Sequence, residues 1–463
     1  MHSLHTGTPG PVFGLPLLAV CLGYFMVILD ATVVTVALPV IGDSLGASVA
    51  GLQWVADGYT LVFAGLLLFS GGLADRLGGR RVFLAGLAVF TLGSAGCAAA
   101  PDTALLVAAR LVQGLGAALL VPASLSVLNI LYTDRAARAR AFGVWGAVAG
   151  VGAGAGPVLG GALTAWLGWR SVFLLNLPVG ALACVLTVRC VPTRSRAAQR
   201  RGGLDLPAQT AAAVGLAGLV TALIEAGERG WADRAVLGAW VVCAAGFLTF
   251  LVLEARSRAP MLPLSLFRRA DLSASVGVGG LLNLGFYGLL FLAPLYFQRV
   301  QHYGPLRTGA ALLPAVCVVA LGSALAGPVT ARTGPRVPMV IGLTVGAAGL
   351  LGWLAAGTGT AYAALVVPMV SVGFGTAFTM PAATAAAMEA VPETRGGAAS
   401  AVLNAARQTG SAVGVALFGT LIAAHLVVGL HRSVVVAAAG FLTAAALAAT
   451  FVRPTARSAN SGQ

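Results

Sequence analysis

Charged residues are scarce in this chain of 463 residues, and lysine is absent from it. Asp, Glu, Lys and Arg together make up 9% of the sequence, whereas an ordinary soluble domain carries about 25% of them. Hydrophobic residues make up 58%. This composition excludes a soluble globular protein. The lack of lysine also excludes a GxxxxGK[ST] nucleotide-binding loop, so we expect no ATP hydrolysis within the chain.

Clusters of metal-binding or catalytic residues are also missing from the sequence. The six cysteines lie singly in or beside apolar runs without CxxC pairs, and the five histidines lie near predicted loops or termini. This pattern predicts neither a disulfide framework nor a metal site. A membrane-embedded hydrolase is not favoured, because it would need a Ser, His and acid constellation or a metal cluster. We expect no cofactor.

Long apolar runs fill most of the sequence and predict an all-α polytopic membrane protein. About 20 apolar residues cross the hydrocarbon core of a membrane, and charged or turn-forming residues separate fourteen such runs. The predicted helices span residues 14–38, 51–73, 82–100, 103–131, 141–165, 171–190, 207–226, 235–253, 272–297, 308–331, 336–357, 361–388, 398–424 and 433–452. The first run has no basic segment before it, so we expect a retained helix rather than a cleaved signal peptide.

The 28 basic residues are all arginines, and they lie mostly on one side of the predicted membrane. Alternating the loops between two sides places twenty arginines on the side of the N-terminus and six on the other, with Arg110 and Arg407 inside helices. The positive-inside rule then predicts a protein of the cytoplasmic membrane with both termini in the cytoplasm. The arginine-rich linker 189–203 is expected to touch anionic lipid headgroups rather than nucleic acid.

A short segment of the first half of the chain recurs in the second half. GGLADRLGGR (71–80) reappears in degraded form as GPVTARTGPR (327–336), at a constant offset of 256 residues. The offset spans eight predicted helices, which fits two six-helix halves of the same orientation separated by two extra helices. Parallel repeats are typical of transporters whose halves rock about a central site. We therefore expect halves at 1–200 and 263–463, joined by two linking helices within 201–262.

Four motifs in order resemble those of one family of transporters. They are LDATVVTVALP (29–39), GGLADRLGGRR (71–81), LVAARLVQGLGAA (106–118) and WRSVFLLNLPVG (169–180). Together they resemble the major facilitator superfamily, and specifically its fourteen-helix drug and proton antiporter branch. The resemblance covers nearly the whole chain and implies the major facilitator fold with helices arranged 6+2+6.

The same resemblance implies a function. It implies proton-coupled efflux of hydrophobic or cationic drugs by alternating access, driven by the proton gradient, with small-molecule substrates, protons and the lipid bilayer as partners and a monomer as the functional unit. Two alternatives stay open: an exporter dedicated to a single metabolite or self-made antibiotic, and a membrane sensor that does not transport.

Three charged residues within predicted helices are candidates for proton coupling. Asp30 lies deep in the first helix without a neighbouring arginine in sequence, and an ionisable group inside a membrane indicates a functional site unless it only caps or packs the helix. Arg110 needs an acidic or carbonyl partner if it is buried. The resemblance implies proton transfer for Arg110, although a structural hydrogen-bonding role is the alternative. Asp57 is either a second protonatable group or part of a solvated rim.

The loop after the second helix is a candidate conformational latch. The resemblance implies a latch that forms in one conformation and breaks in the other, made by Gly71, Asp75, Arg76, Gly78, Arg80 and Arg81. The alternative is positive charge that only determines orientation. The copy of this loop in the second half has Ala331 in place of Asp75, so the two halves are not equivalent.

The fifth helix carries closely spaced glycines. Gly152, Gly156 and Gly160 recur every four residues and predict a face on which another helix backbone approaches closely, and Pro157 can bend the helix. With Gly161 they form G-x-x-x-G-P-x-x-G-G, which resembles the fifth helix of the superfamily's antiporters and implies export.

The ninth predicted helix supplies candidates for a substrate pocket. Asn283, Phe286 and Tyr287 lie in the first helix of the second half and either line a pocket or only pack against other helices. Arg407 is expected near the cytoplasmic end of its helix, where a long side chain reaches solvent.

Overall fold

The computed structural model describes residues 14–132, 134–192, 205–257, 264–392 and 396–453. Within these ranges every regular element is a helix, which confirms the predicted fold class. The expected division points, 200–201 and 262–263, fall outside the described residues, so the limits of the two halves stay a prediction.

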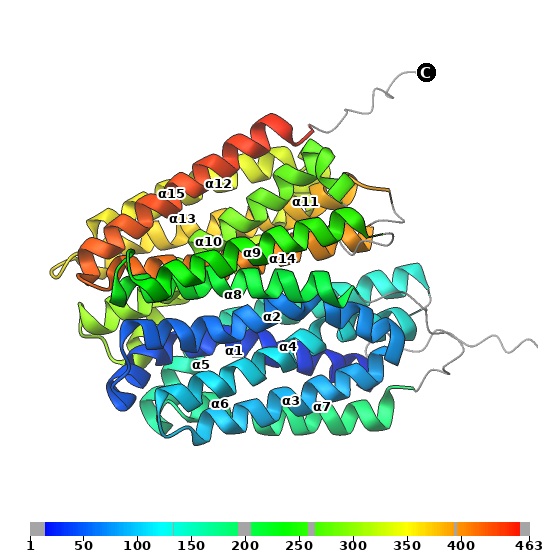
Figure 1. Ribbon diagram of the computed structural model, residues 1–463, viewed down its shortest axis with the longest axis horizontal. Helices are drawn as coiled ribbons and strands as arrows, with labels where there is room; N and C mark the ends of the chain where they lie inside the picture. The colour runs from blue at the N-terminus through cyan, green and yellow to red at the C-terminus, as the bar shows by residue number, and fades with distance from the viewer. Residues whose placement is uncertain (1–13, 133, 193–204, 258–263, 393–395, 454–463) are drawn as a thin grey trace, which may run out of the picture.

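The N-terminal helices form the lower body in Figure 1. They are α1 (Leu15–Leu45), α2 (Val49–Leu77), α3 (Gly79–Ala99), α4 (Thr103–Leu131), α5 (Arg135–Leu167), α6 (Ser171–Leu174) and α7 (Asn176–Cys190). The short α6 and α7 belong to one apolar span. They are separated at Leu175, because Pro178 has no N–H for the carbonyl of Leu174 and its ring crowds that carbonyl.

The remaining helices form the middle and the top of the same view. They are α8 (Leu206–Arg229), α9 (Arg234–Arg256), the 3-10 helix η2 (Leu264–Arg268), α10 (Ala270–Arg299), α11 (Pro305–Thr333), α12 (Arg336–Gly352), the 3-10 helix η3 (Trp353–Ala355), α13 (Tyr362–Glu389), α14 (Gly396–Ile422) and α15 (Leu426–Phe451). The α1 helix begins and α15 ends at the same end of the bundle (Figure 1).

Length and hydropathy identify fewer membrane crossings among the described residues than the fourteen predicted. Among the described residues, 12 helices are long and apolar enough to cross a membrane, and the count rises to 13 with α2, which bends by 56° between Leu67 and Phe69. The α14 helix covers most of the predicted span 398–424 but is not among them. Fourteen crossings therefore stay a prediction.

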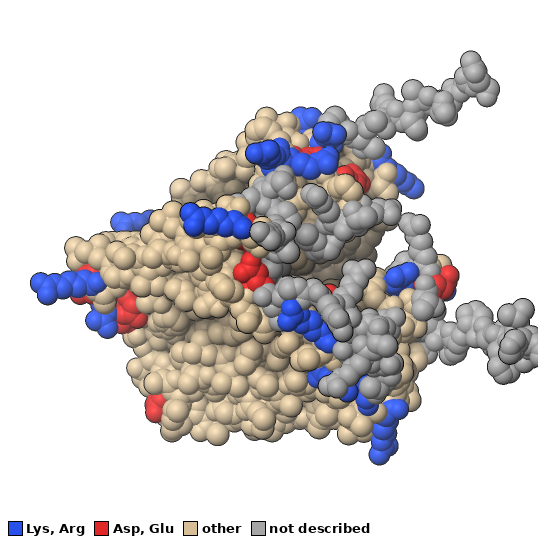
Figure 2. All heavy atoms as spheres, turned by 45° about the vertical axis from the view of Figure 1, so that its right-hand side comes forward, with Lys and Arg blue, Asp and Glu red and all other residues tan. Residues whose placement is uncertain are grey.

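The two halves meet near the end of the bundle where α1 finishes and α11 begins. Gln298 of α10 donates to the carbonyl of Val36 in α1 at 2.8 Å, and Arg299 of α10 pairs with Asp43 of α1 at 3.0 Å. At the opposite end, which the arginine distribution assigns to the cytoplasm, the surface is hollowed between the halves (Figure 2). The halves are therefore bonded to one another at one end of the bundle and set apart at the other.

The first linking helix, α8, is bonded to both halves. Gln209 near its start donates to the carbonyl of Gly65 in α2, and Thr420 of α14 donates to the carbonyl of Leu223 near its end at 2.5 Å. The second linking helix packs mainly on α8. The α8 helix thus connects α2 of one half with α14 of the other.

The glycine face of α5 lies against α1. Gly156 and Gly160 leave no room for a side chain, because a methyl group on Gly156 would overlap Thr32 and one on Gly160 would meet the backbone of Val33. A methyl group on Gly152 would be in tight contact with Phe25. Close approach of two helix backbones maximises van der Waals contact where lipid supplies no hydrophobic driving force. Small residues therefore set the distance between α1 and α5.

The adjoining face of α5 lies against α11 of the other half. A methyl group on Gly161 would meet the backbone of Pro305, and one on Gly309 would meet the carbonyl of Pro157. The α5 helix is therefore held between α1 and α11, and the same glycine-rich segment serves packing within a half and contact between halves.

We expect Gly156→Ala to destabilise the protein by about 1–3 kcal/mol, because the added methyl group forces α1 and α5 apart. Gly150→Ala is the matched control, since nothing lies within 4 Å of a methyl group there. The melting temperature in detergent, followed by size-exclusion chromatography, compares the two variants. Equal melting temperatures would contradict the packing described here.

Candidate functional site

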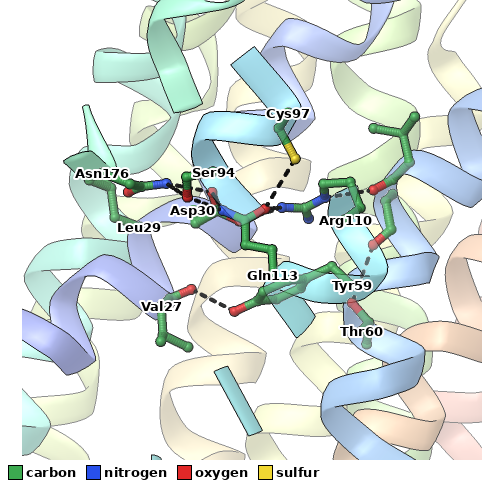
Figure 3. Close-up of polar contacts among 12 residues, drawn as sticks. Val27, Leu29, Asp30, Tyr59, Thr60, Ser94, Cys97, Arg110, Gln113 and Asn176 are labelled. Carbon is green, nitrogen blue, oxygen red and sulfur yellow. Dashed lines mark hydrogen bonds and ion pairs between the residues drawn. The ribbon is translucent and has the colours of Figure 1, made fainter. Parts of the chain in front are cut away.

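A buried ion pair lies at the centre of the N-terminal half. Asp30 of α1 is 0% exposed and Arg110 of α4 is 1% exposed, and Arg110 Nη1 lies 2.5 Å from Asp30 Oδ2. Figure 3 shows the two side chains pointing toward one another between the helices. The structure therefore supplies for Asp30 the positive neighbour that its local sequence lacks.

Two side-chain amides complete the surroundings of the Asp30 carboxylate. Gln113 Nε2 donates to Asp30 Oδ1 at 2.7 Å and Asn176 Nδ2 donates to the same oxygen at 2.9 Å. Both amides also donate to the hydroxyl of Ser94 on α3, at 2.8 and 3.2 Å. The carboxylate thus accepts hydrogen bonds from Arg110, Gln113 and Asn176, a donor set that fits its ionised form.

The Arg110 guanidinium is held by three further groups besides Asp30. Its Nε donates to the carbonyl of Val55 in α2 at 2.9 Å, and its Nη1 donates to Gln113 Oε1 at 2.7 Å. The ring of Tyr59 lies 4.4 Å from the guanidinium carbon, and the Tyr59 hydroxyl donates to the carbonyl of Val27. Hydrogen bonds and the aromatic face both compensate for desolvation of the cation.

A small cavity lies beside this network at the interface between the halves. Its volume is about 60 Å³, well below the roughly 300–1,000 Å³ of sites that enclose a drug-sized ligand. It is lined by Val27, Ile28, Ala31, Val34, Thr35, Ala56, Tyr59, Thr60, Phe63, Arg110, Tyr287, Phe291, Gln408, Ser411 and Val415. A substrate of ordinary size would need the halves to separate further here.

Asp57 lies apart from the ion pair, on the side of α2 that faces α8 and α14. It is 1% exposed, and neither carboxyl oxygen has a hydrogen-bond partner in the described structure. One helical turn before it, Gln53 donates to the carbonyl of Ala416 in α14 at 2.5 Å, and one turn after it, Leu61 packs with α8 and α14 residues. The solvated-rim interpretation of Asp57 is therefore wrong.

The predicted latch residues lie at the open end of the bundle. Arg80 Nη2 donates to the carbonyl of Val188 at the end of α7 at 2.8 Å, where a cation also complements the helix dipole. Gly78 joins α2 to α3 with φ at 89°, a conformation that favours glycine. Asp75 is exposed and is bonded to no residue that the structure describes, and Arg81 is exposed.

Gly71 and Arg76 complete this segment of α2. Gly71 lies near Pro122 of α4, and Arg76, in the last turn of α2, is partly buried. The segment therefore packs against its own half, and a latch between the halves stays a prediction.

The three pocket candidates on α10 have different surroundings. Tyr287 lines the cavity. Asn283 is buried and donates to the carbonyl of Gly279 one turn earlier on its own helix at 2.8 Å, and Phe286 packs against the hydrophobic core. Of these three, the structure brings only Tyr287 to the cavity.

The main residues missed by sequence reasoning are the partners of Asp30. Gln113 and Asn176 both lie within the motifs that carry the family resemblance, 106–118 and 169–180. Their membership of these motifs is the signal that could have identified them. Ser94 of α3 had no such signal.

A double-mutant cycle tests the interaction of Asp30 with Arg110. We expect Asp30→Asn alone to cost about 3–5 kcal/mol of stability, because it leaves a buried cation without its counter-charge. Adding Arg110→Gln removes the unpaired charge, so the double variant should be less destabilised than the sum of the single ones. Unfolding of the purified protein in detergent measures all four forms. Additive effects would show that the two side chains do not interact.

Comparison with solved structures gives the fold. The crystal structure of the nucleoside transporter NupG superposes with a TM-score of 0.66 at 11% sequence identity, covering 95% of this chain and 100% of that chain. At this identity the likeness shows the arrangement of helices alone.

Comparison with known sequences gives the family. The chain is 36% identical to the methylenomycin A resistance protein of Bacillus subtilis (88% of this chain, 87% of the relative). It is 39% identical to the multidrug resistance protein Stp of Mycobacterium tuberculosis (89% and 76%) and 40% identical to the puromycin resistance protein pur8 of Streptomyces alboniger (88% and 81%). The family model of the Major Facilitator Superfamily matches residues 20–415, and the chain belongs to this superfamily of membrane transporters.

Proposed function

We propose that this protein exports antibiotics or other apolar drugs from the cytoplasm in exchange for protons. The observation that carries the proposal is the buried Asp30–Arg110 pair beside a cavity between the two halves. The names of the relatives support the substrate class, since they are resistance proteins for methylenomycin A, for puromycin and for multiple drugs. Export of a single compound is the second candidate, because two of these names specify one antibiotic.

The ionised Asp30 carboxylate fits the inward-open stage of an antiport cycle. Its three hydrogen-bond donors suit a carboxylate, as this stage of the cycle requires after a proton has left for the cytoplasm. In the outward-open stage a proton from outside neutralises Asp30 and releases Arg110 from the ion pair. The proton gradient then biases the two conformations, and no nucleotide or other cofactor takes part.

Asp57 is a second protonatable group in this proposal. It lies where α2 meets α8 and α14, without a hydrogen-bond donor. Ionising a carboxyl group there would place a charge away from water at the contact between the halves. Separation of α2 from α14 at this end would admit water, so gain and loss of a proton at Asp57 follow the opening and closing of the outer end.

Asp75 acts as a latch in the outward-open conformation, when the cytoplasmic end is closed. In the inward-open geometry it has no bonded partner among the described residues, as expected of a latch at the cytoplasmic end that forms when this end closes. The closed outer end of the present structure is instead held by bonds such as Arg299 to Asp43.

Inside-out membrane vesicles test proton-coupled export directly. With the vesicle interior acidified, addition of puromycin should release protons to the outside and load the drug into the vesicles. Asp30→Asn should abolish proton release. A protein that binds puromycin but moves neither drug nor protons would be a sensor, and a wild-type rate in Asp30→Asn would refute coupling at Asp30.

Replacing Asp75 should slow transport, because the inward-open form becomes more stable relative to the outward-open form. We expect Asp75→Asn to lower the puromycin export rate at least about 10-fold, since a loss of about 1.4 kcal/mol in the alternative conformation corresponds to that factor. Glu389→Gln is the matched control, because Glu389 is an exposed acid at the end of α13. Export rates normalised to the amount of protein in the membrane measure both variants, and equal rates would contradict a latch role.

A further inference from the structure

Arg407 of α14 is a partly buried cation that forms no ion pair with any carboxylate in the described part of the chain. It follows Gly396, the first residue of the helix, by eleven positions, a rise of about 16 Å. Its Nη1 lies 3.5 Å from Asn404 Oδ1 and its Nη2 lies 3.3 Å from Met380 Sδ, while its Nε is buried without a hydrogen bond. The side chain as a whole is partly buried, so the structure does not contradict the expectation that it reaches solvent, although its Nε does not.

The ionisable groups that act on Arg407 among the described residues are two tyrosine hydroxyls. The hydroxyls of Tyr24 on α1 and Tyr287 on α10 lie within electrostatic range of the guanidinium. Two buried or partly buried acids on the helices packed against α14 have other surroundings. Asp57 faces the contact with α8, and Asp271 of α10 lies near Arg269 and Arg453 at the cytoplasmic end.

Arg110, which also lies within a membrane helix, differs from Arg407 in having an acidic partner. Arg110 lines the cavity with its charge balanced by Asp30 at 2.5 Å, so that pair adds no net charge. Arg407 adds one positive charge that no ion pair among the described residues balances. Leaving a cation unpaired in this way costs free energy, and a bound anion removes the cost.

Residues next to Arg407 line the cavity, and aromatic residues lie around it. Tyr287 and the next residue along α14, Gln408, both line the cavity. Tyr24 lies one turn before the cavity-lining Ile28 and stacks on Trp145 of α5, with ring centroids 3.7 Å apart. A flat apolar group would find ring faces here, with a guanidinium at the edge.

We propose that Arg407 is an anion-binding subsite and that the transported substrates include aromatic or apolar carboxylic acids. The planar guanidinium can donate two parallel hydrogen bonds to a carboxylate, and the body of the substrate lies toward Tyr24, Tyr287 and Trp145. The proposal rests on the proposed function in taking the cavity as the substrate path. It adds anionic compounds to the apolar and cationic drugs expected as substrates.

Equilibrium binding of three probes of nearly identical shape tests the subsite. The probes are 2-naphthoate, neutral 2-naphthamide and cationic 2-naphthamidine, bound to the purified full chain in lipid nanodiscs and measured by equilibrium dialysis. We expect naphthoate to bind at least about 10-fold more tightly than naphthamide, as one charge-assisted interaction provides. Naphthamidine should bind most weakly.

Variants assign the preference to Arg407. Arg407→Gln should remove the preference for naphthoate while keeping naphthamide binding, which also shows that the pocket is folded, and Arg407→Lys should keep part of the preference. Arg307→Gln removes an exposed arginine that stacks on Tyr303 and should leave the preference intact. Naphthoate that binds no more tightly than naphthamide, or a preference that survives in Arg407→Gln, would overturn the proposal.

The binding test is independent of proton coupling. It uses no proton gradient, so a protein that prefers naphthoate but fails to exchange puromycin for protons would refute the proposed function and leave the subsite standing. A protein that exports puromycin with protons and binds the three probes equally would refute the subsite alone.

Discussion

The buried pairing of Asp30 with Arg110 is the interaction on which the rest of the N-terminal half depends. Two charges away from water are tolerated only when each is fully hydrogen-bonded, and here the bonds come from α2, α3, α4 and α7 as well as α1. Meeting that requirement fixes how five helices pack. Any event that neutralises Asp30 therefore changes a bond that several helices share, and proton uptake can act on a whole half.

Close packing of the glycine-rich helix α5 connects this charge network to the contact between the halves. The α5 helix contacts α1, which carries Asp30, on one face and α11 of the other half on the next. A rearrangement around Asp30 is thus one helix away from the contact between the halves. The linking helix α8 offers a parallel connection, since it is bonded to α2 and α14.

The sequence predicts the helical architecture and the individual buried charges well, because a charge inside an apolar run is conspicuous. It does not predict the pairing of Asp30 with Arg110, since the two are 80 positions apart and their contact depends on how α1 packs on α4. Nothing in the sequence marks Ser94 as a member of this network, because serine is common in membrane helices. The sequence predicts only how far Arg407 lies from the end of its helix, whereas its contacts with α10 and α13 depend on how α14 packs.

The central claim is that Asp30 is ionised in the inward-open protein and gains a proton during the cycle. Infrared difference spectroscopy of the protein in lipid, between alkaline and acidic buffer, observes the carboxyl group itself. The account predicts a protonated-carboxyl band that appears on acidification, is lost in Asp30→Asn, and is reduced when a transported drug is present. A spectrum in which the same band persists in Asp30→Asn would contradict it.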